Sequence, residues 1–262
     1  MSEPILVERR DGIATVIFNR PDQRNALNYW MWLDLRRILV DLETDPEVRV
    51  VVFRGAGTEA FSAGADIKDF DLYRNNSQKA RLYQEAVEGT LKYLERMTCP
   101  TLAMIRGYCV GGGFEFTHAC DLRIASEDAR VGIPAARLGI SIRHEEMRRL
   151  VQLGGRGPAM FLLLTGRLVD AQTALRMGLL DAVVPPEELE EFTYGVARDI
   201  ARLAPLSHRI HKEVLRKVLE DPALAHLTPE EADLPLTVFD TEDYREGRRA
   251  FLEKRPPRFQ GR

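Results

Sequence analysis

Hydrophobic and polar positions alternate in the first part of the chain and then change period. Ile5 and Val7 alternate with polar neighbours before Asp11-Gly12, and an apolar pattern resumes over 13–18, which predicts a β-hairpin over residues 5–18. Helical spacing and short apolar runs follow each other down to about residue 185, which indicates an α/β fold with ligands at the strand-to-helix turns. The predicted helices cover 28–43 and 80–97, and the predicted strands cover 48–55, 101–105 and 122–126.

The pattern changes after Pro185-Pro186. Residues 187–251 are almost wholly helical in spacing and richer in charge, with no convincing strand. We therefore expect two regions, a core over 1–190 and a helical region over 191–262. The second region is expected to pack on the core or on another subunit.

Composition narrows the class of protein. The chain has 262 residues, with 37 Lys and Arg against 40 Asp and Glu, so its formal charge of -3 provides no strong attraction to nucleic acid or an acidic membrane. No run of about 18 uncharged apolar residues occurs, and the first residues lack a secretory pattern. Cys99, Cys109 and Cys120 are odd in number and lie in apolar stretches, which favours a reduced protein. We expect a cytoplasmic protein that binds neither nucleic acid nor membrane.

A glycine cluster is the most informative stretch for chemistry. In IRGYCVGGGFEFTHACD (105–121), Gly111, Gly112 and Gly113 lie between a predicted strand and a predicted helix. They allow close backbone approach to a ligand, and the helix start leaves N–H groups without internal partners, able to stabilise an oxyanion. Glu115 falls in the first helical turn beside them. Alternatively, the glycines only make a tight turn and Glu115 only complements the helix dipole.

A second small-residue segment follows another predicted strand. In FSAGAD (61–66), the backbone N–H of Ala65 is a candidate second donor to the same oxyanion. Two such donors together are more specific than one. Alternatively, this is a loop in which Asp66 caps the next helix.

These segments and others resemble the enoyl-CoA hydratase/isomerase, or crotonase, superfamily, in order and over nearly the whole chain. The resemblance implies a crotonase-type spiral of ββα units with a helical carboxy-terminal region that builds trimers, often paired into hexamers. It also implies an acyl-CoA thioester substrate, with CoA as part of the substrate and no other cofactor or metal, whose carbonyl is held by the N–H groups of Ala65 and Gly112. The segments that carry it are FNRPDQRNALN (18–28), FSAGAD (61–66), GYCVGGGFE (107–115), ACDLRIASEDARVGIPAARLGI (119–140), LTGRLVDAQTALRMGLLDAVVP (164–185) and EDYREGRRAFLEKRPPRFQG (242–261).

Candidate CoA and substrate contacts follow from the same resemblance. Residues 25–27 and 63–67 fall where the family holds the adenine and pantetheine, and local cations are expected to meet the phosphates. Lys254 resembles a lysine that reaches a CoA from its own or a neighbouring subunit, or it is a solvated tail residue. The full set is Arg24, Asn25, Ala26, Leu27, Ala63, Gly64, Asp66, Ile67, Lys68, Gly111, Pro134, Ala135, Leu138 and Lys254.

One departure from the family bears on the reaction. Hydratases of this family use two glutamates, one to activate water and one to exchange the proton at Cα. Glu115 matches the first, but Ala135 occupies the position of the second, and alanine cannot transfer a proton. The ordinary mechanism of hydration therefore cannot be carried over intact.

The neighbouring segment also departs, because residues 142–146, where the family places glycines, are Ile142 followed by four large ionisable residues. Ser141 is predicted to cap a helix that begins here. One hypothesis is that Glu145, the preferred candidate, or His144 supplies the missing acid or base from a new direction. The alternative is that residues 143–146 form a solvated first turn.

Several functional interpretations remain. The first is a hydratase or isomerase with Glu115 as principal base. The second is an acyl-CoA decarboxylase or hydrolase, since methylmalonyl-CoA decarboxylases of the superfamily also lack the second acid, although Ile142 stands where they carry a catalytic tyrosine. The third is a non-catalytic acyl-CoA-binding member, against which the intact glycines and Glu115 argue. His118, one turn beyond Glu115, either faces the pocket or is a satisfied core residue.

Overall fold

Two β-sheets form the centre of the computed structural model, which describes residues 3–262. The first sheet has the order β1-β2-β3-β5-β7-β10, and the second has the order β4-β6-β8-β9. Among the described strands, only β1–β2 and β8–β9 pair antiparallel. The strands are β1 (Ile5–Arg10), β2 (Ile13–Phe18), β3 (Val50–Gly55), β4 (Ala60–Ser62), β5 (Thr101–Ile105), β6 (Tyr108–Val110), β7 (Leu122–Ser126), β8 (Arg130–Gly132), β9 (Val169–Asp170) and β10 (Ala182–Val184).

Successive strand pairs along the chain extend both sheets. The successive pairs β3 and β4, β5 and β6, and β7 and β8 each add one strand to the first sheet and one to the second. Helices connect the pairs, so the chain winds as a spiral of ββα units. The predicted fold class is confirmed.

The predicted local elements are confirmed with shifts of a few residues at their ends. Asp11 and Gly12 both have positive φ (53° and 79°), as a two-residue turn of type I′ requires, and β1 and β2 form the hairpin. The helix α1 (Tyr29–Thr44) begins where the side chain of Asn28 accepts a hydrogen bond from the Met31 N–H. The helix predicted over 80–97 is α3 (Ser77–Arg96).

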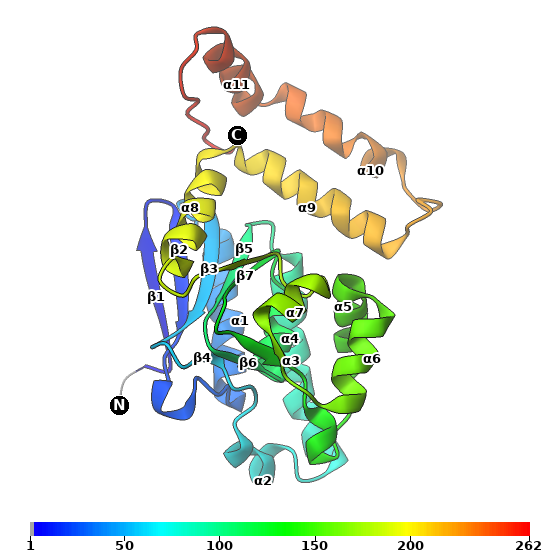
Figure 1. The fold of residues 1–262 in the computed structure, drawn as a ribbon. Coiled ribbons are helices and arrows are strands. Elements are labelled where there is room, and N and C mark those ends of the chain that lie inside the picture. The colour runs from blue at the N-terminus through cyan, green and yellow to red at the C-terminus, as the bar shows by residue number, and fades with distance from the viewer. Residues whose placement is uncertain (1–2) are drawn as a thin grey trace.

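The first sheet is buried on both faces. Val51, Phe53 and Ala103 point into a cluster with α1, α3 and α4 (Gly112–His118). Val50 and Val52 point the other way, towards α8 (Leu189–Arg202). Figure 1 shows α8 on one side of this sheet and α1 on the other. Burial on both faces explains why these strands are continuous apolar runs rather than alternating patterns.

After Val184 the described chain is helical, as the change of pattern predicted. Figure 1 shows α10 and α11 at the end of the molecule, beyond α8 and α9. The expected boundary at 190–191 falls in the first turn of α8, a helix that packs on the core sheet. The remaining helices are α2 (Phe70–Tyr73), α5 (His144–Gly154), α6 (Arg156–Thr165), α7 (Ala171–Arg176), α9 (Pro205–Glu220), α10 (Pro229–Asp233) and α11 (Glu242–Leu252), with 3-10 turns at Pro21–Gln23, Ile67–Asp69, Ala135–Leu138 and Leu234–Asp240.

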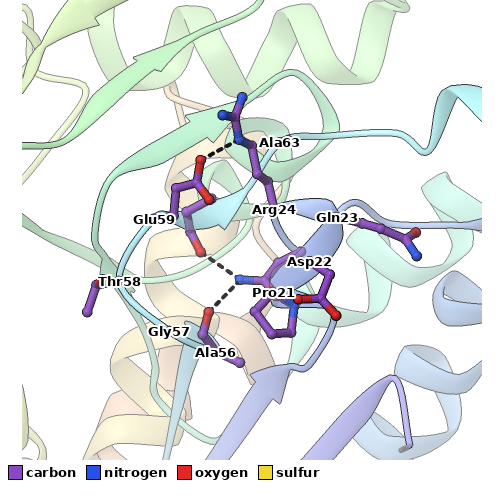
Figure 2. A pocket seen from close by; sticks show the side chains of 11 residues that line it. Pro21, Asp22, Gln23, Arg24, Ala56, Gly57, Thr58, Glu59 and Ala63 are labelled. Carbon is purple, nitrogen blue, oxygen red and sulfur yellow. Dashed lines mark hydrogen bonds and ion pairs between the residues drawn. The ribbon is translucent and has the colours of Figure 1, made fainter. Parts of the chain in front are cut away.

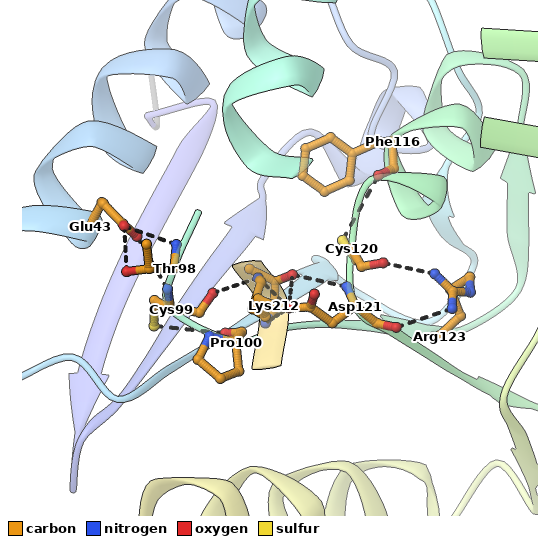
Figure 3. A network of polar contacts seen from close by, with 10 residues as sticks. Glu43, Thr98, Cys99, Pro100, Phe116, Cys120, Asp121, Arg123 and Lys212 are labelled. Atoms are coloured by element: carbon orange, nitrogen blue, oxygen red, sulfur yellow. Dashed lines mark hydrogen bonds and ion pairs between the residues drawn. The ribbon is translucent and has the colours of Figure 1, made fainter. Parts of the chain in front are cut away.

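A polar network fastens the helical region to the core (Figure 3). Lys212 on α9 donates to the carbonyl oxygen of Cys99 at 3.0 Å and to Oδ2 of Asp121 at 2.6 Å. The same Asp121 oxygen accepts the backbone N–H of Thr101 at the start of β5. A single lysine therefore connects α9 to two loops of the core.

Within residues 3–262, no helix has the length and apolar character needed to span a bilayer.

Candidate active site

A cavity of about 340 Å³ opens where the second sheet meets α3, α4 and the start of α5. The walls are mainly apolar, with a few ionisable side chains among them. Sequence reasoning placed Ala63, Gly64, Ala65, Ile67, Gly111, Gly112, Glu115, Pro134, Ala135 and Leu138 together, and all of them line this cavity. The other lining residues are Trp32, Phe70, Arg74, Tyr83, Gln84, Val87, Val110, Ile133, Arg137, Ile140, Ser141, Ile142, Glu146 and Leu168.

Two backbone N–H groups meet at one wall of the cavity. A Cβ atom built on Gly112 would lie 3.8 Å from the Ala65 nitrogen, so the two amides are neighbours. Within residues 3–262, neither N–H donates to a protein acceptor. Both are therefore available to one ligand oxygen, which is the arrangement of an oxyanion hole.

Backbone geometry explains the small residues at this wall. Gly64 and Gly111 have positive φ (92° and 52°), and a Cβ on Gly64 would approach the Val110 carbonyl oxygen to 2.6 Å. A Cβ on Gly113 would lie 2.6 Å from Cβ of Ser62. The glycines therefore let the two N–H groups come together, beyond making a tight turn.

Glu115 lies beside these donors in the first turn of α4, where its own N–H donates to the Gly111 carbonyl at 2.8 Å. Burial, and after it the negative charge of Glu146, raises the pKa of Glu115 to about 8, although Arg74 and Arg149 act in the opposite direction. At neutral pH the Glu115 side chain is therefore largely protonated. A carboxyl group whose pKa lies near the working pH is suited to proton transfer.

Glu146 is the second carboxyl group at the cavity, and sequence reasoning treated it only as part of a solvated turn. Its residue is 6% exposed, and its side chain accepts hydrogen bonds from the Gln84 amide and from the Arg143 backbone N–H. Ala135 lines the cavity without contributing an acid.

The placement expected for Glu145 and His144 is corrected by the structure. Neither side chain lines the cavity; His144 is exposed and Glu145 is partly exposed. The expected cap at Ser141 is also wrong, because α5 begins at His144 with Arg143 in extended conformation as its N-cap. This later start turns Glu146 inward.

The segments carrying residues 24–27 and 63–66 pair with each other. Leu27 donates its N–H to the Gly64 carbonyl at 2.8 Å, and Asp66 donates its N–H to the Leu27 carbonyl at 2.9 Å. The Asp66 carboxylate accepts from the Lys68 N–H, the capping role that was its alternative interpretation, and it also pairs with Arg20 at 2.8 Å. The backbone hydrogen bonds between these two segments fix the position of the Ala65 N–H, which lies between Gly64 and Asp66.

A second cavity, of about 720 Å³, adjoins the first at Ala63 (Figure 2). Arg24 is at its edge, paired with Glu59 at 2.6 Å and stacked on the Tyr108 ring. Asn25 is fully buried, and its amide donates to the carbonyl oxygens of Ala56 and Ala60, so its side chain shapes the loop.

The outlying cations are not brought to the acyl cavity within one chain. Lys68 is exposed and is absent from the cavity lining. Lys254 is exposed, has a positive φ of 54° and follows α11, which Figure 1 shows at the end of the molecule opposite α2.

His118 does not line the cavity. It is buried with its ring edge against Phe114, and neither ring nitrogen has a hydrogen-bond partner among residues 3–262. Burial lowers the pKa of His118 to about 3, so the ring stays neutral. It is a core residue, but not a satisfied one.

Sequence reasoning missed the wall formed by α3 and the residues before it. Tyr83 and Gln84 on α3 line the cavity together with Trp32 on α1, and the Tyr83 hydroxyl group accepts a hydrogen bond from Nε1 of Trp32 at 3.3 Å. Arg74 lies over the rings of Phe70 and Tyr83. Polar residues on the apolar face of α3 were the signal that could have found this wall.

Within residues 3–262, no group of three or more His, Cys, Asp or Glu residues is arranged to hold a metal ion.

Two neighbouring backbone donors and a carboxyl group in one cavity are the groups that stabilisation of an enolate and transfer of a proton require. The family model for enoyl-CoA hydratase/isomerase matches residues 8–262. The chain belongs to the enoyl-CoA hydratase/isomerase family, and it is a hydratase/isomerase-like lyase.

Named relatives and solved structures agree with this family. The short-chain-enoyl-CoA hydratase of Clostridium acetobutylicum is 34% identical over 96% of this chain and 95% of its own length. The (E)-benzylidenesuccinyl-CoA hydratase of Thauera aromatica is 36% identical over 98% and 99%. The crystal structure of an enoyl-CoA hydratase/carnithine racemase from Magnetospirillum magneticum has a TM-score of 0.96 and 35% identity, covering 100% of this chain and 97% of that one.

Proposed function

We propose that this enzyme adds water reversibly across the Cα=Cβ bond of an enoyl-CoA thioester, with Glu115 as a proton-transfer group. The observation that carries the proposal is the partly buried Glu115 beside the free N–H groups of Ala65 and Gly112 in one mainly apolar cavity. Relatives named as hydratases of short-chain-enoyl-CoA, crotonyl-CoA and (E)-benzylidenesuccinyl-CoA support this class of substrate.

The oxyanion hole accounts for activation of the substrate. With the thioester oxygen between Ala65 and Gly112, both N–H groups donate to it, and they donate more strongly as it gains enolate charge. Loss of one such donor costs roughly 3 to 4 kcal/mol in other enzymes. The fixed pairing of the two segments means that these donors need no rearrangement during the reaction.

The CoA portion is proposed to follow the passage from the acyl cavity past Ala63 into the second cavity beside Arg24. Both cavities share Ala63, and Arg24 supplies a positive charge for phosphate. Lys68 is close in sequence to the cavity lining, and Lys254 would serve a neighbouring subunit. No cofactor other than the CoA of the substrate is proposed.

The alternative reactions gain no support from the geometry. Ile142 lines the cavity at the position where the related decarboxylases carry a tyrosine, and it offers no hydroxyl group. The free donors and the partly buried carboxyl group argue against a site that has lost its catalytic function.

A homotrimer, alone or paired into a hexamer, is proposed as the working assembly. The helical region leaves large apolar side chains in solvent when a single chain is considered. They include Leu215, Leu236, Phe239, Phe251 and Leu252, which are 56%, 58%, 53%, 83% and 72% exposed. Burial of such a surface between copies would stabilise the assembly.

The test is turnover of crotonyl-CoA by the wild type and by Glu115→Gln. We expect the variant to lose roughly 100- to 10,000-fold in kcat, because the acid–base group is removed, while CoA-ester binding stays within about tenfold. Glu127→Gln, at an exposed glutamate between β7 and β8, is the matched control and should turn over normally. Unchanged turnover by Glu115→Gln would contradict the role given to this residue.

A further inference from the structure

Two carboxyl groups from different helices line the acyl cavity. Glu115 comes from the first turn of α4, and Glu146 is the third residue of α5. The charge of Glu146 is felt at Glu115, where it is the second contribution, after burial, to the raised pKa. The two groups therefore form an interacting pair inside one cavity, although the family's usual second position is Ala135.

The Glu146 carboxylate is held by a donor on each oxygen. Oε1 accepts a hydrogen bond from the Gln84 amide on α3, and Oε2 accepts the backbone N–H of Arg143 at 2.6 Å. Each carboxylate oxygen has two lone pairs, so these contacts orient the group and still leave acceptor sites for water at the cavity.

We propose that Glu146 is the second catalytic carboxylate of this enzyme. It takes the proton of the attacking water while Glu115 delivers its own proton to Cα, which reverses the role that the resemblance gives to the position of Glu115. The proposal rests on the proposed hydratase function. Gln84 and the Arg143 N–H are positioning groups, since they act through Glu146.

The step balances in protons and electrons. Glu146 accepts a proton from water as the water oxygen forms its bond to Cβ, and the electron pair of the Cα=Cβ bond moves into the thioester as an enolate. The enolate, held by Ala65 and Gly112, returns that pair to Cα as Cα takes the proton of Glu115. Glu146 is then protonated and Glu115 ionised, and exchange of one proton with solvent at each group restores the starting pair.

The groups around Glu115 act on its ionisation in opposite directions. Arg74, which has no ion-pair partner among residues 3–262, and Arg149, which is paired with Glu88 at 2.8 Å, both favour ionisation of Glu115, while burial and Glu146 oppose it. The nearby Tyr83 has its pKa raised to about 12 and stays neutral. Glu115, with a pKa of about 8, is therefore largely protonated at neutral pH and can serve as a proton donor.

The adjacent Glu145 provides a matched control. It is in the same first turn and has the same chemistry, but it does not line the cavity, and a hydrogen bond from its own backbone N–H at the helix start lowers its pKa. The variants Glu146→Gln and Glu145→Gln differ by one position in the chain and test opposite predictions.

The experiment measures two reactions for the wild type and the variants Glu146→Gln, Glu145→Gln and Glu115→Gln at pH 8. One is hydration of crotonyl-CoA. The other is exchange of the Cα protons of butyryl-CoA in D₂O, which needs the oxyanion hole and a base at Cα but no attacking water. We expect Glu146→Gln to lose roughly 100- to 10,000-fold in hydration yet keep proton exchange within about tenfold. Glu145→Gln should be unchanged in both reactions.

Each outcome decides the matter. Hydration retained by Glu146→Gln, or hydration and exchange lost together in a folded variant, would overturn the role of Glu146. Hydration lost by Glu145→Gln instead would overturn it as well. The proposed function fails separately, if the wild type hydrates no enoyl-CoA or if Glu115→Gln keeps both reactions.

Discussion

The core and the helical region that follows it bury their side chains very differently. All six residues of β2 and all five of β5 are buried within one chain. In contrast, α9 has 16 residues and none is buried, and α11 buries only Asp243 and Ala250. The core therefore buries its apolar strands within one chain, whereas the helical region keeps large apolar side chains exposed.

Beyond α8, whose apolar side chains pack on the core sheet, polar contacts help to hold the helical region. Lys212 connects α9 to the core through Asp121, and Asp243 on α11 accepts the N–H groups of Gln260 and Gly261 from the tail. Directional contacts of this kind fix the orientation of helices but contribute little net free energy, about 1 kcal/mol each. We infer from this difference that the core provides most of the stability and positions the candidate active site. Assembly is expected to depend on the helices.

The largest effect on stability is expected at Arg149, behind the active site. Its side chain is 2% exposed and pairs with Glu88 and Glu95, so Arg149→Met leaves a buried carboxylate without its partner. We expect a loss of about 3 to 5 kcal/mol in the free energy of unfolding, measured with urea. Arg148→Met, at a 44% exposed side chain, should cost less than about 1 kcal/mol. Equal costs would show that burial does not distinguish the two arginines.

Glu115→Gln is expected to raise the free energy of unfolding, by less than Arg149→Met lowers it. The pKa of Glu115 is about 8 in the folded chain against an ordinary value of 4.5. The stabilisation of the folded, protonated carboxyl is complete below pH 4.5 and is lost as the pH rises to about 8, at about 1.4 kcal/mol per unit. Glutamine does not ionise, so the variant does not lose this stabilisation as the pH rises. It should be more stable than the wild type by about 3 kcal/mol at pH 7, and this advantage should disappear at pH 4. A difference that does not change with pH would contradict the raised pKa.

The smallest effect on folding, with a change of assembly, is expected in the helical region. Replacing both Phe251 and Leu252 by serine should lower the mass in analytical ultracentrifugation to 29.8 kDa, that of one chain, with an unchanged circular dichroism spectrum. Val40→Ser, on the exposed side of α1, should leave the assembly intact. A wild type that is already a single chain, or a double variant that stays assembled, would contradict the proposed trimer.

Local signals in the sequence determined much of this protein. Asp11-Gly12 specified the hairpin because both residues tolerate positive φ, and the apolar runs specified the buried strands. The glycines at 111–113 and Glu115 are close in sequence, so their grouping at one helix start followed from spacing alone. The small-residue pattern made the Ala65 N–H a candidate second donor and the resemblance paired it with Gly112, and the structure shows that Ala65 and Gly112 are neighbours.

Only the tertiary structure decided which ionisable residue of 143–146 enters the cavity. Successive residues of a helix point about 100° apart, so an error of two residues in the start of α5 changes which side chain faces inward. The Arg143 N–H binding to Glu146 and the Gln84 amide from α3 set that start and that direction, and α3 is about 60 residues away in sequence. Contacts between elements this distant depend on packing, which the local pattern of a single sequence does not encode.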